Sequence, residues 1–117
     1  MEIAEVDDTK IVEMKDDPLF IGGKVSIQAL AGVVGEPGTF MVHFTPGART
    51  RMHTHTGSQY LFVTKGKGVV GTPEKKREVS PGTLVYFPPL EPHFHGAGES
   101  EPFTHLSIGG GNMKLVD

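Results

Sequence analysis

The sequence contains no cysteine among its 117 residues. This absence excludes disulfides, thiolate metal sites, iron–sulfur clusters and cysteine nucleophiles. The sequence also lacks an apolar run long enough to cross a bilayer. Its first ten residues are acidic and lack the apolar stretch of a signal peptide. We therefore expect a cytoplasmic protein that makes no contact with a membrane.

Basic residues are not in excess. Eleven Lys and Arg stand against fourteen Asp and Glu, which gives a net charge of −3 and leaves no basic face for contacts with nucleic-acid phosphates. The carboxylates form no convincing acid pair, and the sequence has neither a Gly-x-Ser-x-Gly nucleophile turn nor a phosphate-cradling glycine loop. We expect a small-molecule substrate and no nucleic-acid partner.

Turn-forming residues are abundant: 16 glycines and 9 prolines are spread along the chain. They separate short apolar or alternating runs, and no sustained helical periodicity is present. Ser80-Pro81-Gly82-Thr83 fits a type II turn, because Pro fixes φ and Gly supplies a positive φ. The runs lie at residues 25–30, 39–44, 59–65, 69–72, 84–87 and 103–108. This pattern predicts an all-β sandwich or barrel.

The length predicts one domain. We expect residues 21–117 to form the β-domain and residues 1–20 to form an N-terminal arm with at most one edge strand. Such an arm could pair with a second copy of the chain, so we expect a homodimer formed through strand or arm exchange.

Three of the six histidines predict a metal site. His53 and His55 are two residues apart, so on a strand they share a face and lie about 6.6 Å apart along it. Two imidazoles at that spacing can converge on one ion with bonds of about 2.1 Å. His93 follows a segment with three prolines in residues 87–92, and so restricted a loop is suited to holding a ligand in place.

These residues carry a resemblance to the cupin family. Gly47, His53-Thr54-His55, Gln59 and Gly66 resemble the first cupin motif in order and spacing. Gly82, Pro88 and His93 resemble the second. The resemblance implies a jelly-roll β-barrel that holds one divalent metal ion on His53, His55, Gln59 and His93.

The sequence departs from the usual cupin pattern at three positions. Gln59 stands where most cupins have a metal-binding Glu, Leu90 replaces a usual Gly, and Ala97 replaces a usual Asn. Gln59, together with His93-Phe94-His95-Gly96 and Thr104-His105-Leu106, resembles a narrower group. That group comprises the manganese-dependent cupin hydroxynitrile lyases and the small cupins found with carboxymuconolactone decarboxylases. The resemblance implies manganese, while imidazole ligands also accept Fe, Ni and Zn.

A site of three imidazoles and one amide adds no negative charge, so a bound dication would keep its full charge and act as a strong Lewis acid. This favours hydroxynitrile-lyase-like cleavage or formation of a C–C bond over dioxygen activation. Two alternatives stay open: a metal-dependent oxygenase or isomerase of a small oxygenated metabolite, and a non-catalytic metal- or ligand-binding module.

His95 and His105 are the candidate catalytic residues. His95 is expected on the face of His93, and His105 lies in a late strand; either could act as a general acid or base, or could only hydrogen-bond a ligand. His43 is expected to be a surface or hydrogen-bonded residue. The expected apolar lining consists of Phe40, Val42, Leu61, Val63 and Phe87.

Overall fold

The computed structural model describes residues 1–32 and 37–117. It contains thirteen strands in the described residues and one short 3-10 helix, η1 (Asp8–Lys10). The six-stranded sheet has the order β1 (Val12–Glu13), β3 (Val25–Ala29), β4 (Gly38–Phe44), β12 (Phe103–Gly109), β7 (Gln59–Gly66), β10 (Leu84–Phe87). The five-stranded sheet has the order β2 (Phe20–Ile21), β5 (Arg49–Thr50), β11 (Phe94–Ala97), β8 (Gly68–Gly71), β9 (Lys76–Val79). A third, two-stranded sheet pairs β13 (Met113–Leu115) with β6 (His53–His55).

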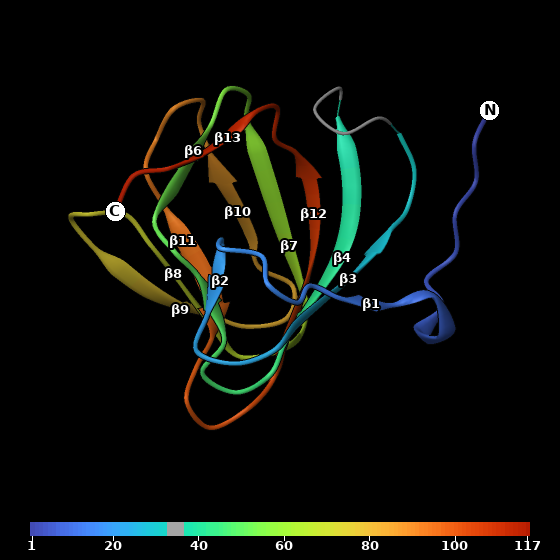
Figure 1. Cartoon of the computed structure of the whole chain (residues 1–117), viewed down its shortest axis with the longest axis horizontal. Coiled ribbons are helices and arrows are strands. Elements are labelled where there is room, and N and C mark those ends of the chain that lie inside the picture. The colour runs from blue at the N-terminus through green and yellow to red at the C-terminus, as the bar shows by residue number, and fades with distance from the viewer. Residues whose placement is uncertain (33–36) are drawn as a thin grey trace.

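The predicted all-β class is confirmed, with neighbouring strands antiparallel throughout these pairings. The two large sheets face each other (Figure 1) and remain separate hydrogen-bonded ladders in the described part of the chain. The expected barrel is therefore a two-sheet jelly roll whose strands do not close into one continuous ring. The edge strands β1 and β10 of one sheet do not pair with the edge strands β2 and β9 of the other.

The predicted strands appear within one or two residues of their expected ends, and the turn residues explain why they end there. Gly82 adopts φ 90° and the Thr83 N–H donates to the Ser80 carbonyl at 3.1 Å, as the predicted type II turn requires. Gly66 adopts φ 73° between β7 and β8, where a Cβ would overlap the Pro102 carbonyl. This turn takes the chain from the six-stranded sheet to the five-stranded one.

The sequence predicted no strand between residues 73 and 83, but Lys76 and Arg77 belong to β9. They are exposed there, at the edge of the five-stranded sheet. Charged side chains are common on edge strands because they discourage pairing with another chain. The alternation in this strand is weak, which explains why the sequence did not predict it.

The core lies between the inward faces of the two sheets. Of the expected apolar lining, Val42, Leu61, Val63 and Phe87 belong to the buried cluster and Phe40 packs against it half-buried. Alternation along β7 is clear, since Gln59, Leu61 and Val63 are buried and Tyr60 and Phe62 are exposed. One face of the strand therefore builds the core and the other faces outward.

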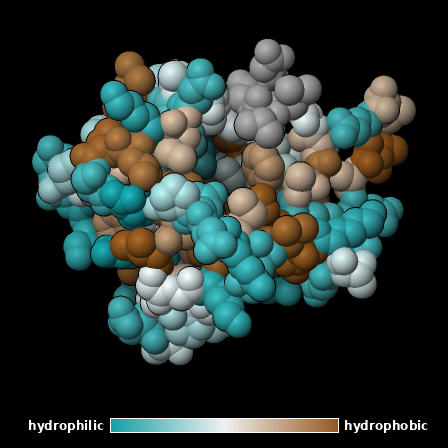
Figure 2. All heavy atoms as spheres, viewed as in Figure 1, coloured by the Kyte–Doolittle hydropathy of each residue, from teal (hydrophilic) through white to brown (hydrophobic). Residues whose placement is uncertain are grey.

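The N-terminal arm contains η1, β1 and the first residue of β2, and its part before β1 extends away from the sheets (Figure 1). Gln28 on β3 holds it: the Asp7 N–H donates to Gln28 Oε1 at 2.9 Å, and Gln28 Nε2 donates to the Glu5 carbonyl at 2.8 Å. On the face shown in Figure 2, hydrophilic residues surround separate apolar groups. No helix in residues 1–32 or 37–117 is long and apolar enough to span a membrane.

Candidate metal centre

His53 and His55 project from β6 toward one point, as their spacing predicts. Their ring centroids are 5.0 Å apart. The strand is held by pairing with β13, in which Leu115 lies opposite His53 and Met113 lies opposite His55. The C-terminal strand thus fixes the segment that carries both imidazoles.

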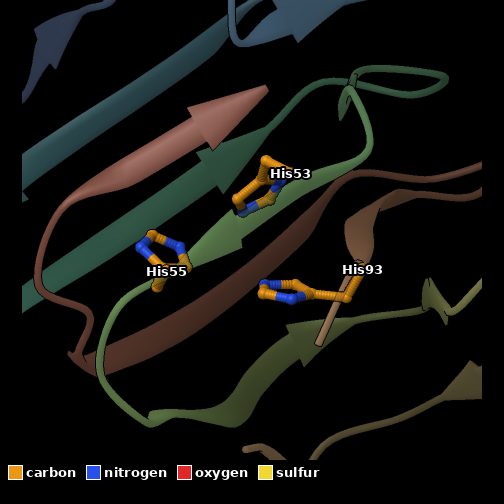
Figure 3. A group of neighbouring side chains, drawn as sticks. All are labelled: His53, His55 and His93. Carbon is orange, nitrogen blue, oxygen red and sulfur yellow. The ribbon is translucent and has the colours of Figure 1, made fainter. Parts of the chain in front are cut away.

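His93 joins them from the proline-rich loop. Its backbone forms two hydrogen bonds with His53: the His53 N–H donates to the His93 carbonyl at 3.0 Å, and the His93 N–H donates to the His53 carbonyl at 2.9 Å. The His93 ring lies 4.4 Å from the His53 ring and 5.6 Å from the His55 ring. One ring nitrogen from each residue lies within 4.8 Å of the others (Figure 3). We refer to His53, His55 and His93 as the three-histidine cluster.

Leu90 helps to fix this loop. Its N–H donates to the His55 carbonyl at 2.9 Å, and its φ is 68°, in the left-handed region that favours glycine. The position where cupins usually have glycine therefore keeps a backbone shape suited to glycine, although its side chain is Leu.

Hydrogen bonds to carbonyl groups set which nitrogen faces the centre. Nδ1 of His53 lies 2.8 Å from the Arg51 carbonyl, and Nδ1 of His93 lies 2.9 Å from the Glu91 carbonyl. A carbonyl can only accept, so each Nδ1 carries the proton and each Nε2 keeps its lone pair. Both ring nitrogens of His55 are buried and have no hydrogen-bond partner among residues 1–32 and 37–117.

Burial keeps these imidazoles neutral. It lowers the pKa of His93 to about 3 and that of His55 to about 4, the latter also through repulsion from His53. Burial lowers the pKa of His53 as well. At neutral pH the cluster therefore offers lone pairs, which are what a metal ion requires.

Gln59, at the start of β7, places a fourth acceptor beside the cluster. Its Oε1 lies 2.9 Å from Nε2 of His93, and its Nε2 donates to Ser107 Oγ at 3.0 Å. Because His93 carries its only proton on Nδ1, two acceptors face each other with no hydrogen between them. A cation resolves this conflict, so the residues present fit the metal ion that the resemblance implies.

His95 and His105 form a separate pair, which we call the histidine pair. Nε2 of His105 lies 3.0 Å from Nδ1 of His95. The His95 ring lies 5.7 Å from that of His53 and 6.0 Å from that of His93, so it borders the three-histidine cluster. His105 is fully buried, 5.6 Å from the rings of both Phe44 and Phe103, and is positioned behind His95. Burial lowers the pKa of His95 well below its usual value and that of His105 to about 3.

Aromatic side chains line the site. Phe87 stacks on His93 with centroids 3.8 Å apart and planes 9° apart, and Phe44 meets His95 edge-on at 5.8 Å. These rings cover His93 and His95, and electrostatic interactions are stronger in such apolar surroundings than in water.

His43 and Ser107 lie outside the predicted set of site residues. Nδ1 of His43 lies 3.1 Å from Thr104 Oγ1, so its expected hydrogen-bonded role is confirmed. Ser107, the partner of Gln59, was not predicted as a site residue. Its position two residues after His105, and therefore on the same face of β12, is the sequence feature that could have indicated it.

Comparisons with known proteins agree with this geometry. The sequence matches the family described as the cupin domain over residues 40–109. It is similar to the (R)-mandelonitrile lyase of Granulicella tundricola, with 41% identity over 96 residues, or 79% of this chain and 64% of that protein. The chain thus spans slightly less than two thirds of the length of this relative.

Two solved structures share the fold. A cupin-like protein from Thermotoga maritima has a TM-score of 0.75 and 28% identity, over 99% of this chain and 86% of that chain. An acetylacetone dioxygenase from Acinetobacter johnsonii has a TM-score of 0.80 at 20% identity, over 100% of this chain and 78% of that chain. The family match covers more than half of the sequence, and its limits enclose all three histidines of the cluster. The chain belongs to the cupin domain family.

Proposed function

We propose that the protein is a metal-dependent lyase that cleaves a small cyanohydrin into a carbonyl compound and hydrogen cyanide, and that catalyses the reverse addition. The observation that carries this proposal is the set of four uncharged acceptors around one point, bordered by the histidine pair. The similarity to a mandelonitrile lyase supports the choice of substrate class.

The ligands in this proposal are His53, His55 and His93 through ring nitrogens and Gln59 through Oε1. Manganese is the expected metal, and Fe, Ni and Zn suit the same imidazoles. When bound, the ion supplies Lewis acidity that stabilises negative charge on a substrate oxygen or on cyanide. The hydrogen bond to Ser107 holds the Gln59 amide with its oxygen toward the cluster.

His95 is the proposed proton carrier. In this proposal its Nδ1–H donates to Nε2 of His105, which leaves Nε2 of His95 with a lone pair for the substrate. Nε2 takes the proton of the cyanohydrin hydroxyl, the bond between the carbinol carbon and the nitrile carbon breaks, and the oxygen forms the carbonyl double bond. The departing cyanide then takes the same proton from His95, so no proton or electron is gained or lost overall.

His105 acts through His95 as a positioning residue. It packs against Phe44 and Phe103, and its Nε2 lies 3.0 Å from Nδ1 of His95. Phe87 and Phe44 keep water away, which protects the proton on His95 from exchange with solvent.

The test is an assay of mandelonitrile cleavage, followed by the ultraviolet absorbance of benzaldehyde. Protein loaded with Mn²⁺ should give turnover well above that of free Mn²⁺ at the same concentration, and chelation should abolish it. Oxygen uptake with diketones and catechols is measured on the same samples. Oxygen consumption without cyanohydrin cleavage would identify an oxygenase, and inactivity in both assays would favour a binding module; either result would refute the proposed lyase.

A further inference from the structure

A cleft lies at the edge of the fold where β9 of the five-stranded sheet and β10 of the six-stranded sheet approach without pairing in the described part of the chain. Its volume is about 230 Å³. None of the residues proposed above for metal binding or proton transfer lines it. We call it the edge cleft, and its lining includes Val70, Val79, Val85, Phe87, Lys75 and Arg77.

The inner walls of the edge cleft are apolar. Val70, Val79 and Phe87 are buried and belong to the core cluster, and Val85 packs against that cluster half-buried. An apolar group that fills such a cleft leaves water without giving up hydrogen bonds, so its binding is favourable. These walls therefore select a ligand with an apolar body.

The volume limits the size of that body. An apolar cavity of about 150 Å³ holds one benzene molecule. The edge cleft, at about 230 Å³, accommodates a single aromatic ring with one short substituent. Larger ligands occupy pockets of roughly 300–1,000 Å³, so the edge cleft is too small for a ligand with two or more rings.

Two cations stand at the exposed side of the edge cleft. Arg77 lies opposite Val70 in the pairing of β8 with β9, so its side chain starts on the inward face of the sheet. Lys75 lies in the turn between these strands, where its carbonyl accepts from the Thr72 N–H at 2.9 Å. Both side chains are exposed, and neither forms an ion pair within residues 1–32 and 37–117.

The lining carries one positive charge in excess. Among the described residues that line the cleft, Glu91 alone is acidic, against the two cations Lys75 and Arg77. A ligand with a single negative charge balances this lining. The half-buried Thr83 adds a hydroxyl group that can donate to an anion.

We propose that the edge cleft binds a small aromatic monocarboxylate, with its ring between the apolar walls and its carboxylate at the Arg77 guanidinium. A guanidinium presents its N–H groups in a planar fork that matches the two oxygens of a carboxylate. A neutral aromatic molecule would leave both cations without a counterion. An amino acid would add a third cation to a lining that already has one in excess.

Phe87 connects the edge cleft with the candidate metal centre. Its ring lines the cleft and also stacks on the ring of His93, with centroids 3.8 Å apart. A ligand in the cleft is therefore one side chain away from His93. The site does not depend on lyase activity, because its walls and charges belong to residues outside the proposed reaction.

The test is a titration of the full chain with 4-fluorobenzoate, followed by fluorine NMR. One probe molecule should bind per chain, with or without Mn²⁺, because the edge cleft contains no proposed metal ligand. Arg77→Gln should weaken binding on the order of 10-fold, as expected when a charge-assisted hydrogen bond is lost at a partly exposed site. Fluorobenzyl alcohol, the neutral analogue, and phenylalanine, the zwitterionic one, should both bind more weakly than 4-fluorobenzoate.

The matched control is Lys76→Gln. It removes a cation from the same strand, but alternation directs Lys76 to the opposite face, and it does not line the edge cleft. Lys76→Gln should therefore leave the affinity nearly unchanged. Equal weakening by the two substitutions would show general attraction to a basic strand and would overturn the proposal, as would tighter binding of either analogue.

A second measurement locates the probe in the wild-type protein. Nuclear Overhauser effects should connect its ring protons with the methyl groups of Val70 and Val79. Contacts with Val42 and Val63, which pair with His105, would instead place the probe beside the histidine pair and would overturn the proposal. Absence of binding at about 10 mM probe would overturn it too. Cyanohydrin turnover is measured separately, so failure of the proposed lyase and failure of this site are distinguishable.

Discussion

The three-histidine cluster and the histidine pair contain the same side chain, buried in four of the five residues and half-buried in His55, yet their ring nitrogens have different partners. In the cluster, Nδ1 of His53 and of His93 is bound to a carbonyl, and the remaining nitrogens converge without a proton between them. In the pair, a ring nitrogen of one residue faces a ring nitrogen of the other at hydrogen-bond distance. This difference in the partner of each nitrogen, more than burial, is the reason why we propose metal binding for the cluster and proton transfer for the pair.

The largest expected effect comes from removing one member of the cluster. His93→Ala deletes a ring that contacts Gln59 and both other histidines, so metal content should fall from about one ion per chain to near zero after dialysis. Elemental analysis measures it. His43→Ala is the matched control, since His43 lies outside the cluster and should leave the metal in place. Equal metal content in the two variants would contradict the assignment.

A smaller effect should distinguish the two members of the histidine pair. His95→Ala should retain the metal and lose roughly 10²–10⁴-fold in kcat, the usual range for a proton-transfer group. His105→Ala removes only the residue behind it and should lose about 10–100-fold. Steady-state kinetics on metal-loaded protein measure both.

A positioning role for His105 leads to one further expected result. His105→Gln can still hydrogen-bond His95 and should recover part of the lost kcat, with little change in KM. A larger loss in His105→Ala than in His95→Ala would reverse the assigned roles.

The sequence predicted the cluster better than the histidine pair for a physical reason. Two-residue spacing on a strand fixes the relative direction of His53 and His55, so their convergence follows from local geometry. The proximity of His95 and His105 instead depends on β11 and β12 lying in different sheets that face each other across the core. Only the tertiary packing shows that His95 borders the cluster and that His105 stands behind it.

The strands, like the site residues, could be predicted only where a local sequence pattern determines them. Strand β7 alternates clearly between buried and exposed residues and ends at Gly66, and β12 ends at Gly109, so the positions of these strands could be predicted. Strand β13 has only three residues, too few to show an alternating pattern. It is a strand because it pairs with β6. Ser107 became a site residue through its contact with Gln59, a contact that no local pattern encodes.

The smallest expected effect concerns acid stability, and it examines the histidine pair without any metal. Burial lowers the pKa of His105 to about 3 in the folded protein, against 6.5 for an ordinary histidine. As the pH falls, His105 therefore becomes protonated in the unfolded chain before it does so in the folded protein. The free energy of unfolding is unaffected by this difference above pH 6.5 and decreases as the pH falls from 6.5 toward 3. At pH 5 the loss is about 2 kcal/mol, since each unit of difference corresponds to about 1.4 kcal/mol.

Urea unfolding of chelated protein at pH 7 and pH 5 measures this loss. Wild type should lose about 2 kcal/mol more between the two pH values than His105→Leu, because the variant has no proton to bind at this position. The difference between pH values is the readout, so a uniform change in stability caused by the substitution does not affect it. His43→Leu is the comparison, since His43 is less buried and its pKa is also lowered by burial; it should change the pH dependence less. If wild type and His105→Leu lose the same free energy, the pKa of His105 in the folded protein is the same as in the unfolded chain, and burial does not lower it.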